Sequence, residues 1–300
     1  MDAADLRVFE AVARCGGMSR AAAELHTVQS NVTARIRLLE TELGAPLFFR
    51  HRRGVGLTPA GRRLLPYAAK ISVLLQDARR AVAEDGTPKG PLLIGSLETA
   101  AALRLSRILA GFAAACPDVD MSLSTGTSAS LIDDVLGHRL DGAFVAGPVR
   151  HPELSEEPVF REELVLLTAR NVRGWDDLLL RRNLKLVVFR AGCSYRQVLE
   201  AMLAERGVVG VRRLEFGTLD GILGCVAADI GVTMLPRAVL APEWDPRIAM
   251  HQLPRDQGRV DTVFVRRSDA FASAAMEAFV AYVRPPGLGV VALGAVAAAE

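Results

Sequence analysis

Gln29-Ser30-Asn31-Val32-Thr33-Ala34-Arg35-Ile36-Arg37-Leu38-Leu39-Glu40 decides the fold of the first part of this chain, because one short helix would carry two different surfaces here. Apolar residues recur at spacings of four, three and four, as Val32, Ile36, Leu39 and Leu43. This spacing predicts the buried stripe of an amphipathic helix. The opposite face holds short polar side chains and guanidiniums, the groups that read base edges and bind phosphates. The segment therefore predicts a DNA-reading helix.

The preceding residues complete a helix-turn-helix. A first amphipathic helix follows from its apolar residues, Leu6, Phe9, Val12 and Ala13, and Gly16-Gly17 would end it. Ser19 is the expected N-cap of a compact second helix over residues 20–25, and His26-Thr27-Val28 would turn into the DNA-reading helix. In this motif the second helix of the pair enters the major groove. An ordinary helical hairpin with scattered arginines is the alternative interpretation.

A basic segment follows, Arg50-His51-Arg52-Arg53-Gly54-Val55-Gly56-Leu57-Thr58, and it predicts a β-hairpin wing lying along the phosphates. A solvated basic loop is the alternative. The charge distribution favours the wing, because residues 1–65 carry ten arginines against six acidic residues, whereas residues 91–300 carry 22 basic against 25 acidic residues. The net charge of +2 is thus the sum of a basic first part and a mildly acidic remainder, as expected for a chain that binds a polyanion at one end.

A long helix should come next, with Thr58 as its N-cap and Pro59 at its first position. It carries a heptad seam suited to pairing with another helix, made of Leu64, Ala68, Ile71, Leu75, Ala78 and Val82. Packing of this seam against the chain's own core is the alternative. Pro66 lies inside the helix and should bend it or leave one carbonyl unpaired. Residues 84–91 then end the helix and predict a hinge.

From residue 91 onward, predicted strands and helices alternate. The strands are expected at residues 92–96, 121–125, 143–146, 164–168, 184–189, 214–217, 232–235 and 262–265, and the helices near residues 100–115, 130–137, 195–206, 220–228 and 272–283. Such alternation predicts a parallel sheet covered by helices. A segment of this length could form one large domain or two small ones.

The first 65 residues or so resemble the N-terminal domain of LysR-type transcriptional regulators, and the rest of the chain fits that family by length and layout. The resemblance is carried by Leu6, Phe9, Ser19, Ala22, Ala23, Leu25, Gln29, Ser30, Ile36, Leu39, Glu40, Leu43, Gly44, Leu47, Phe48, Arg50 and Leu57-Thr58-Pro59-Ala60-Gly61. Ala34 departs from the pattern, since many relatives have a long polar or basic side chain early in this helix. Base preference therefore does not transfer from the family.

The resemblance implies an α+β multi-domain fold with a winged helix-turn-helix at residues 1–58, a linker and dimerisation helix with a hinge at residues 59–90, and an effector-binding domain at residues 91–300. The last domain should be similar to periplasmic binding proteins, with α/β lobe I at residues 91–161 plus 267–300 and lobe II at residues 162–266. Two crossing strands are expected near residues 159–164 and 263–267. The family also implies a homodimer or a dimer of dimers on an interrupted palindrome, and it allows a contact with RNA polymerase.

On this interpretation the partner is double-stranded DNA. The base-reading residues are Gln29, Ser30, Thr33, Ala34 and Arg37, with Asn31 and Arg35 at the groove edges and Arg50, Arg52 and Arg53 on phosphates. Arg37→Ala should relax site preference, whereas Arg53→Ala should weaken binding to all sequences.

A cleft between the two lobes is the expected effector site, built from loops that follow strands and open helices. Its candidate residues are Ser96, Glu98, Thr99, Gly126, Thr127, Ser128, Gly192, Cys193, Ser194, Arg196 and Thr218. Small hydroxyl residues at helix starts are also ordinary caps, which is the alternative. Helix N-termini near Arg196 would suit a carboxylate or another small anion, whereas Glu98 could repel an anion or bind a ligand amine. We expect a metabolite-sized effector whose binding shifts the angle between the lobes and hence the spacing of the DNA heads.

Other chemistry is sparse. Four cysteines without paired spacing predict a reduced protein. Cys193, at an expected helix start, is a candidate redox sensor through a lowered pKa, with burial as the alternative. Dispersed histidines and the lack of a phosphate-binding loop or nucleophile elbow predict no metal, no cofactor and no enzyme activity.

The acidic start Met1-Asp2-Ala3-Ala4-Asp5 is unlike a signal peptide, and no apolar segment reaches membrane-spanning length, so a cytoplasmic location without membrane contact is expected. The apolar tail at residues 285–300 could add a strand or helix to a partner or stay disordered. The competing function is a transport-type or enzymatic ligand domain fused to an architectural DNA binder. Turnover assays on a bound ligand would separate the two.

Overall fold

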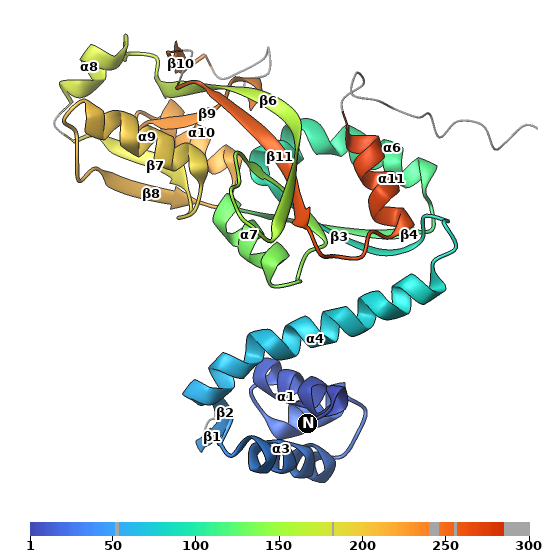
Figure 1. Cartoon of the computed structure of the whole chain (residues 1–300). Helices are drawn as coiled ribbons and strands as arrows, with labels where there is room; N and C mark the ends of the chain where they lie inside the picture. The colour runs from blue at the N-terminus through green and yellow to red at the C-terminus, as the bar shows by residue number, and fades with distance from the viewer. Residues whose placement is uncertain (52–53, 182, 240–245, 255–256, 285–300) are drawn as a thin grey trace, which may run out of the picture. The chain divides into compact units, whose positions relative to one another are not determined.

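A computed structural model of the chain describes residues 1–51, 54–181, 183–239, 246–254 and 257–284. The chain divides into two compact units, Met1–Asp85 and Gly86–Glu300, whose helices and strands are labelled in Figure 1. Arg52, Arg53 and the apolar tail at residues 285–300 lie outside the described residues, so the expectations placed on them are not addressed by the structure.

The first unit begins with three helices and a hairpin. They are α1 (Ala3–Cys15), α2 (Met18–Glu24), α3 (Gln29–Leu43), β1 (Phe48–His51) and β2 (Gly54–Leu57), and the two strands pair antiparallel. The N-cap of α2 is Gly17, not the expected Ser19. The helix starts earlier because Met18 packs into the core, and the Ser19 hydroxyl donates to Gln29 Oε1 instead of capping.

The apolar stripe of α3 is confirmed for three of its four residues. Val32, Ile36 and Leu39 are almost fully buried, whereas Leu43 is 39% exposed. The helix ends at that point, because Gly44 takes the left-handed conformation, with φ near +63°. Glu40 then fixes the end of α3 to β1, since its carboxylate accepts the N–H groups of Leu47 and Phe48.

The long helix α4 (Pro59–Ala83) starts as expected, with the Thr58 side chain accepting the Gly61 N–H. It runs as one helix through Pro66, whose side chain is exposed. The heptad seam divides in two along this helix. Its first part packs on the core of the first unit, where Ala68 is fully buried, whereas Leu75 and Val82 are 38% and 90% exposed. The alternative of packing on the chain's own core therefore holds for the first part only.

The second unit contains nine strands and the helices between them within its described residues. The strands are β3 (Gly90–Leu97), β4 (Val119–Gly126), β5 (Gly142–Ala146), β6 (Leu154–Ala169), β7 (Lys185–Phe189), β8 (Arg212–Phe216), β9 (Thr233–Pro236), β10 (Ile248–Gln252) and β11 (Arg259–Arg267). The helical segments are α5 (Glu98–Ala100), the π-helix η1 (Ala101–Leu105), α6 (Ser106–Ala115), α7 (Ser128–Leu136), α8 (Trp175–Leu179), α9 (Ser194–Glu205), α10 (Leu219–Ala227), the short η2 (Arg237–Val239) and α11 (Ala274–Val283).

The strand pairing is mixed, which corrects the expectation of a parallel sheet. Strand β3 pairs parallel with β4 and β5, and β7 pairs parallel with β8. Strands β6 and β11 run antiparallel to all their partners, and the main sheet has the order β10-β6-β11-β5-β3-β4, with β9 also on β6. Parallel pairing thus holds only where a helix returns the chain between neighbouring strands.

The long strands β6 and β11 join the two lobes (Figure 1). We call the part built on β3, β4, β5, α5 to α7 and α11 the first lobe, and the part built on β7 to β10 and α8 to α10 the second lobe. Strand β6 includes the crossing expected near residues 159–164, and β11 includes the one expected near residues 263–267 and pairs with β5 at residues 262–265.

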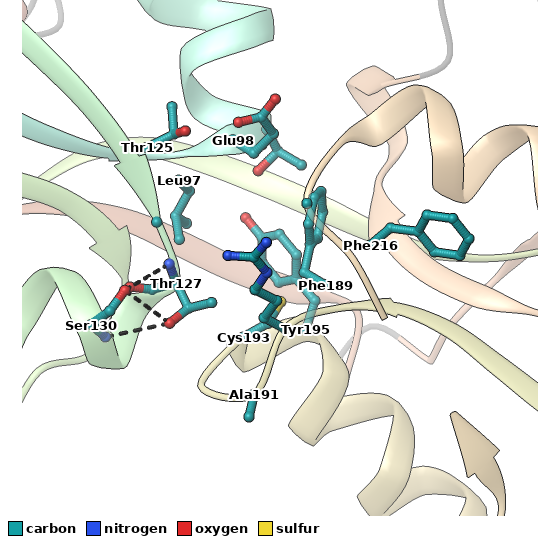
Figure 2. Close-up of a pocket in the computed structure, with 14 residues that line it drawn as sticks. Leu97, Glu98, Thr125, Thr127, Ser130, Phe189, Ala191, Cys193, Tyr195 and Phe216 are labelled. Atoms are coloured by element: carbon teal, nitrogen blue, oxygen red, sulfur yellow. Dashed lines mark hydrogen bonds between the residues drawn. The ribbon is translucent and has the colours of Figure 1, made fainter. Parts of the chain in front are cut away.

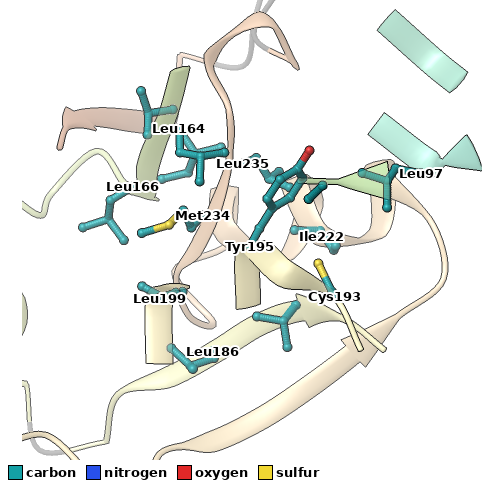
Figure 3. Close-up of a cluster of buried hydrophobic side chains, with 14 of the residues drawn as sticks. Leu97, Leu164, Leu166, Leu186, Cys193, Tyr195, Leu199, Ile222, Met234 and Leu235 are labelled. Atoms are coloured by element: carbon teal, nitrogen blue, oxygen red, sulfur yellow. The ribbon is translucent and has the colours of Figure 1, made fainter. Parts of the chain in front are cut away.

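Each lobe has its own buried side chains. The rings of Phe112, Phe144, Phe264 and Phe279 pack together in the first lobe. In the second lobe, leucines and other apolar residues of β6, β7, β9, α9 and α10 form the core shown in Figure 3. Cys193 and Tyr195 belong to this core, which continues to Leu97 of the first lobe. None of the helices in the described part of the chain is both long and apolar enough to cross a membrane.

Candidate functional site

The exposed face of α3 carries most of the side chains expected to read DNA. Ser30, Ala34 and Arg37 are exposed on it, while Thr33 is partly buried at its side. Within the described part of the chain, the Arg37 guanidinium makes no hydrogen bond or ion pair. A free guanidinium on an exposed helix face can donate bidentate hydrogen bonds to a guanine edge or a phosphate.

Three neighbouring side chains are held by partners inside the first unit. Ser19 donates to Gln29 Oε1 at 3.0 Å, and Asn31 Nδ2 donates to Thr27 Oγ1 at 3.0 Å. These contacts fix the orientation of two amides at the start of α3. Arg35 differs, because its Nη1 lies 3.0 Å from Asp5 Oδ1 on α1, and the Asp5 side chain is only 10% exposed. Arg35 therefore links α3 to α1, and its expected position at the groove edge stays a prediction.

A cavity of about 410 Å³ lies in the second unit, between side chains of both lobes (Figure 2). It opens at the carboxyl ends of two parallel strand pairs, β3 with β4 and β7 with β8. The loops that follow parallel strands converge there, as in other open α/β sheets. Its lining residues are Leu97, Glu98, Thr99, Thr125, Gly126, Thr127, Ser130, Phe189, Arg190, Ala191, Cys193, Tyr195, Phe216 and Gly217.

The cavity has one polar and one apolar part. Thr127 and Ser130 form a reciprocal capping box at the start of α7, drawn with dashed lines in Figure 2. Tyr195 contributes its ring and hydroxyl; burial raises the pKa of this phenol to about 12, although hydrogen bonds to Thr99 and Thr262 act against the shift. Tyr195 therefore stays neutral and can donate or accept a hydrogen bond across the physiological pH range.

Two charged groups line the same cavity from opposite lobes. Glu98 opens α5 in the first lobe and is partly buried, while Arg190 follows β7 in the second lobe and is exposed. In the described structure neither side chain makes a hydrogen bond or ion pair. The described residues also contain no cluster of potential ligands for a metal ion.

Comparison with known protein families accounts for both units. Residues 3–62 match the family model described as bacterial regulatory helix-turn-helix protein, lysR family, and residues 85–285 match the LysR substrate binding domain. The chain belongs to the LysR family of transcriptional regulators. It is a DNA-binding regulator with an effector-binding domain, and its named relatives are transcriptional regulators, not enzymes.

Similar proteins cover nearly the whole chain. The transcriptional regulators GltR and YusT of Bacillus subtilis are 41% and 43% identical over 93% of this chain, and over 95% and 94% of their own lengths. Among solved structures, full-length CbnR in complex with its target DNA is 25% identical, with a TM-score of 0.63 over 94% of this chain and 99% of that one. A full-length OxyR variant from Pseudomonas aeruginosa shares the fold, with a TM-score of 0.69 over 94% of each chain at 19% identity.

In this LysR-family chain, five of the eleven expected effector residues line the cavity: Glu98, Thr99, Gly126, Thr127 and Cys193. Three others have structural contacts. The Ser96 hydroxyl is buried and donates to the Leu97 carbonyl, while Ser128 Oγ accepts the Ala146 N–H and the Ser194 hydroxyl. Gly192 has φ near +93° and packs so closely that an added Cβ would lie 2.7 Å from Thr127 Oγ1. Thr218 is the N-cap of α10 and does not line the cavity.

Arg196 is not the cation of the cavity. Its guanidinium pairs with Glu200 at 3.1 Å and with Glu215 at 2.7 Å, and its side chain is only 13% exposed. Arg190 takes the position expected of Arg196, and sequence analysis missed it. The available signal was that Arg190 directly follows the carboxyl end of a buried strand, where ligand-binding loops begin.

Cys193 does not have the lowered pKa expected of a redox sensor. Burial raises the pKa of its thiol, and hydrogen bonds from backbone N–H groups at the start of α9, together with the charge of Arg196, offset this only in part. Among the four cysteines it is the buried one. A thiol that stays protonated reacts slowly, so its position supports the packing role given as the alternative.

Proposed function

We propose that this LysR-family regulator reads its operator through the exposed face of α3 and holds the flanking phosphates through the wing. The observation that carries the proposal is the contrast along α3, where Val32, Ile36 and Leu39 are buried while Ser30, Ala34 and Arg37 are exposed. Gln29 and Thr33 complete the base-reading set, with Asn31 at the groove edge. The wing arginines at positions 50, 52 and 53 supply charge without sequence information.

We assign the regulatory ligand to the cavity between the lobes. A small molecule held by loops of both lobes stabilises one angle between them, and that angle sets the spacing of the DNA heads. The protein acts as a homodimer or a dimer of dimers in the cytoplasm, joined through the exposed part of the α4 seam. Contact with RNA polymerase belongs to the same proposal.

The division of roles on DNA is tested with two arginine variants in quantitative binding assays. Arg37→Ala should lower discrimination between the operator and a mutated operator by about 1–3 kcal/mol, because a base contact is lost. Arg53→Ala should weaken binding to every sequence and flatten the logarithmic salt dependence by about one unit, because a phosphate contact is lost. If both variants respond alike, the proposed roles are wrong.

The effector site is tested by filling the cavity. Ala191 is exposed and lines the cavity, so Ala191→Trp should occupy the space without disturbing a core. The matched control is Ala201→Trp on exposed α9, outside the lining. Footprints on the operator with a low-molecular-weight extract of bacterial cells should change for the native protein and the control, but not for Ala191→Trp. A response that survives in Ala191→Trp would place the effector elsewhere.

A further inference from the structure

We infer that the effector of this regulator is a free α-amino acid, bound with its ammonium group at Glu98 and its carboxylate at Arg190. The inference rests on the proposed function of the cavity as the effector site and specifies the chemistry of that site. It depends on which charged groups line the cavity and on what they contact.

The two charges of the cavity lack partners in the described structure. Elsewhere in the second unit, arginines that approach acidic residues form ion pairs, such as Arg196 with Glu215 at 2.7 Å and Arg213 with Glu200 at 2.6 Å. Glu98 and Arg190 line one cavity yet form no ion pair with each other or with other described residues. The cavity therefore holds one carboxylate that can pair with a cationic group of a ligand and one guanidinium that can pair with an anionic group. Neither pairs with another described residue.

The placement of these groups suits a ligand that carries both charges. Glu98 belongs to the first lobe, and Arg190 belongs to the second lobe, where its guanidinium nitrogen lies 3.7 Å from the position of a Cβ built on Gly217. A purely anionic ligand would bring its charge near Glu98, and a purely cationic ligand would face Arg190. A zwitterion satisfies both groups at once.

The remaining lining fits the rest of an amino acid. Leu97, Phe189 and Phe216 offer apolar surface for a side chain, while Thr127 and Ser130 offer hydroxyls for polar atoms. A volume of about 410 Å³ accommodates a molecule of this size with water. Because the two charges come from different lobes, the same ligand would hold the lobes together, which links recognition to the change in lobe angle.

The test measures binding of each proteinogenic L-α-amino acid to the full-length protein by calorimetry. For every amino acid that binds, the des-amino carboxylic acid and the decarboxylated amine are measured in the same way. We expect at least one amino acid to bind, with both truncated analogues roughly ten- to hundredfold weaker, as for loss of a charge-assisted hydrogen bond. The inference is overturned if no amino acid binds or if either analogue binds as well as its parent.

Two charge variants test which group of the ligand Glu98 and Arg190 each bind. Glu98→Gln should weaken the amino acid roughly tenfold or more but leave the des-amino acid unchanged or tighter, because repulsion is removed. Arg190→Gln should weaken the amino acid and the des-amino acid alike and spare the amine. The controls are Glu205→Gln and Arg150→Gln, which change exposed charges outside the lining and should leave all affinities unchanged. Equal losses in the variants and the controls would contradict the assignment.

Failure of the amino-acid inference can be distinguished from failure of the proposed effector site. If the cell extract changes the footprint of the native protein and Ala191→Trp abolishes the change, the cavity is the effector site. The absence of amino-acid binding would then overturn only the chemistry inferred here. If Ala191→Trp leaves the response intact, the site itself is wrong, whatever the amino-acid measurements give.

Discussion

At the scale of single residues, the ion pair between Arg35 and Asp5 separates stability from recognition on α3. Asp5 is the N3 residue of the capping box of α1, and its nearly buried carboxylate meets the Arg35 guanidinium. Removing Arg35 leaves that carboxylate without its cationic partner. Arg37, the arginine that we propose to read bases, has no comparable contact within the described chain, so its loss should not affect folding.

We therefore expect Arg35→Ala to lower the free energy of unfolding by about 1–3 kcal/mol, as for a partly buried carboxylate that loses a charged partner. Chemical denaturation of the full chain, followed by the helical signal of the first unit, measures the change. Arg7→Ala, an exposed position on α1, is the control and should change stability by less than about 0.5 kcal/mol. At temperatures where Arg35→Ala is folded, it should keep the native order of preference among operator variants. A relaxed sequence preference would show that Arg35 contacts DNA at the groove edge.

The charged residues of the second unit show what sequence could decide at this scale. Arg196 and Arg190 both lie near the start of α9, and only Arg190 directly follows a strand end, but the local pattern does not show that Arg196 is paired. Arg196 is removed from the cavity by Glu215, a residue of β8 whose register against β7 brings the two together. That register is a tertiary property, so the sequence analysis expected a cation beside the cavity but named Arg196 in place of Arg190.

At the scale of elements, strong periodicity predicted the helices and buried strands to within a few residues. The full lengths of the long strands β6 and β11 were not predicted, because charged residues interrupt their apolar pattern. The residue pattern predicted β6 only at residues 164–168, and the family resemblance placed a crossing strand near residues 159–164. The start of the strand was missed because its first half includes two adjacent glutamates and a proline and lacks strict alternation. Those charges are matched across the strand pair, as where Arg161 lies opposite Asp261 on β11 with 2.9 Å between Nε and Oδ1. The partner that makes the segment a strand lies a hundred residues away, so local pattern could not reveal it. Strand β10 and helix α8 were missed because five residues carry too little periodicity.

The division of the α4 seam gives a prediction for self-association. Leu75 and Val82 are exposed at seam positions, and their burial in a second chain would explain their spacing. The double variant Leu75→Glu and Val82→Glu should weaken the dimer by at least about a hundredfold, since two carboxylates would be buried without partners. Gln76→Glu adds a charge to another face of the same exposed turn and is the control. Sedimentation velocity over a concentration series measures the change, and circular dichroism checks that the fold persists. An unchanged dimer would assign the interface to another surface.

At the scale of the whole molecule, the two units have separate cores, and the chain passes from one to the other in the segment at residues 84–89. Gly86 in this segment has φ near +81°, and a Cβ added to it would meet no atom within 4 Å. A regulator that converts a change of lobe angle into a change of head spacing needs a connection of this kind. The chain also offers a direct probe of it, because it contains only three lysines, Lys70, Lys89 and Lys185.

These lysines lie in three different structural settings, so a lysine-specific endoprotease should distinguish them. Lys70 is within α4 and Lys185 within β7, where cleavage requires local unfolding, whereas Lys89 is exposed and directly precedes the first residue of β3. We expect Lys89 to be cleaved at least about tenfold faster than the other two under native conditions. Only the end of β3, where the Gly90 N–H donates to the Asp118 carbonyl, has to open there. Mass spectrometry of the early digest should show a cut after Lys89 first. Lys89→Arg removes the site and should leave the chain intact over the same interval. Early cleavage at Lys70 would instead show that α4 opens more readily than the segment between the units, and the hinge would then belong inside that helix.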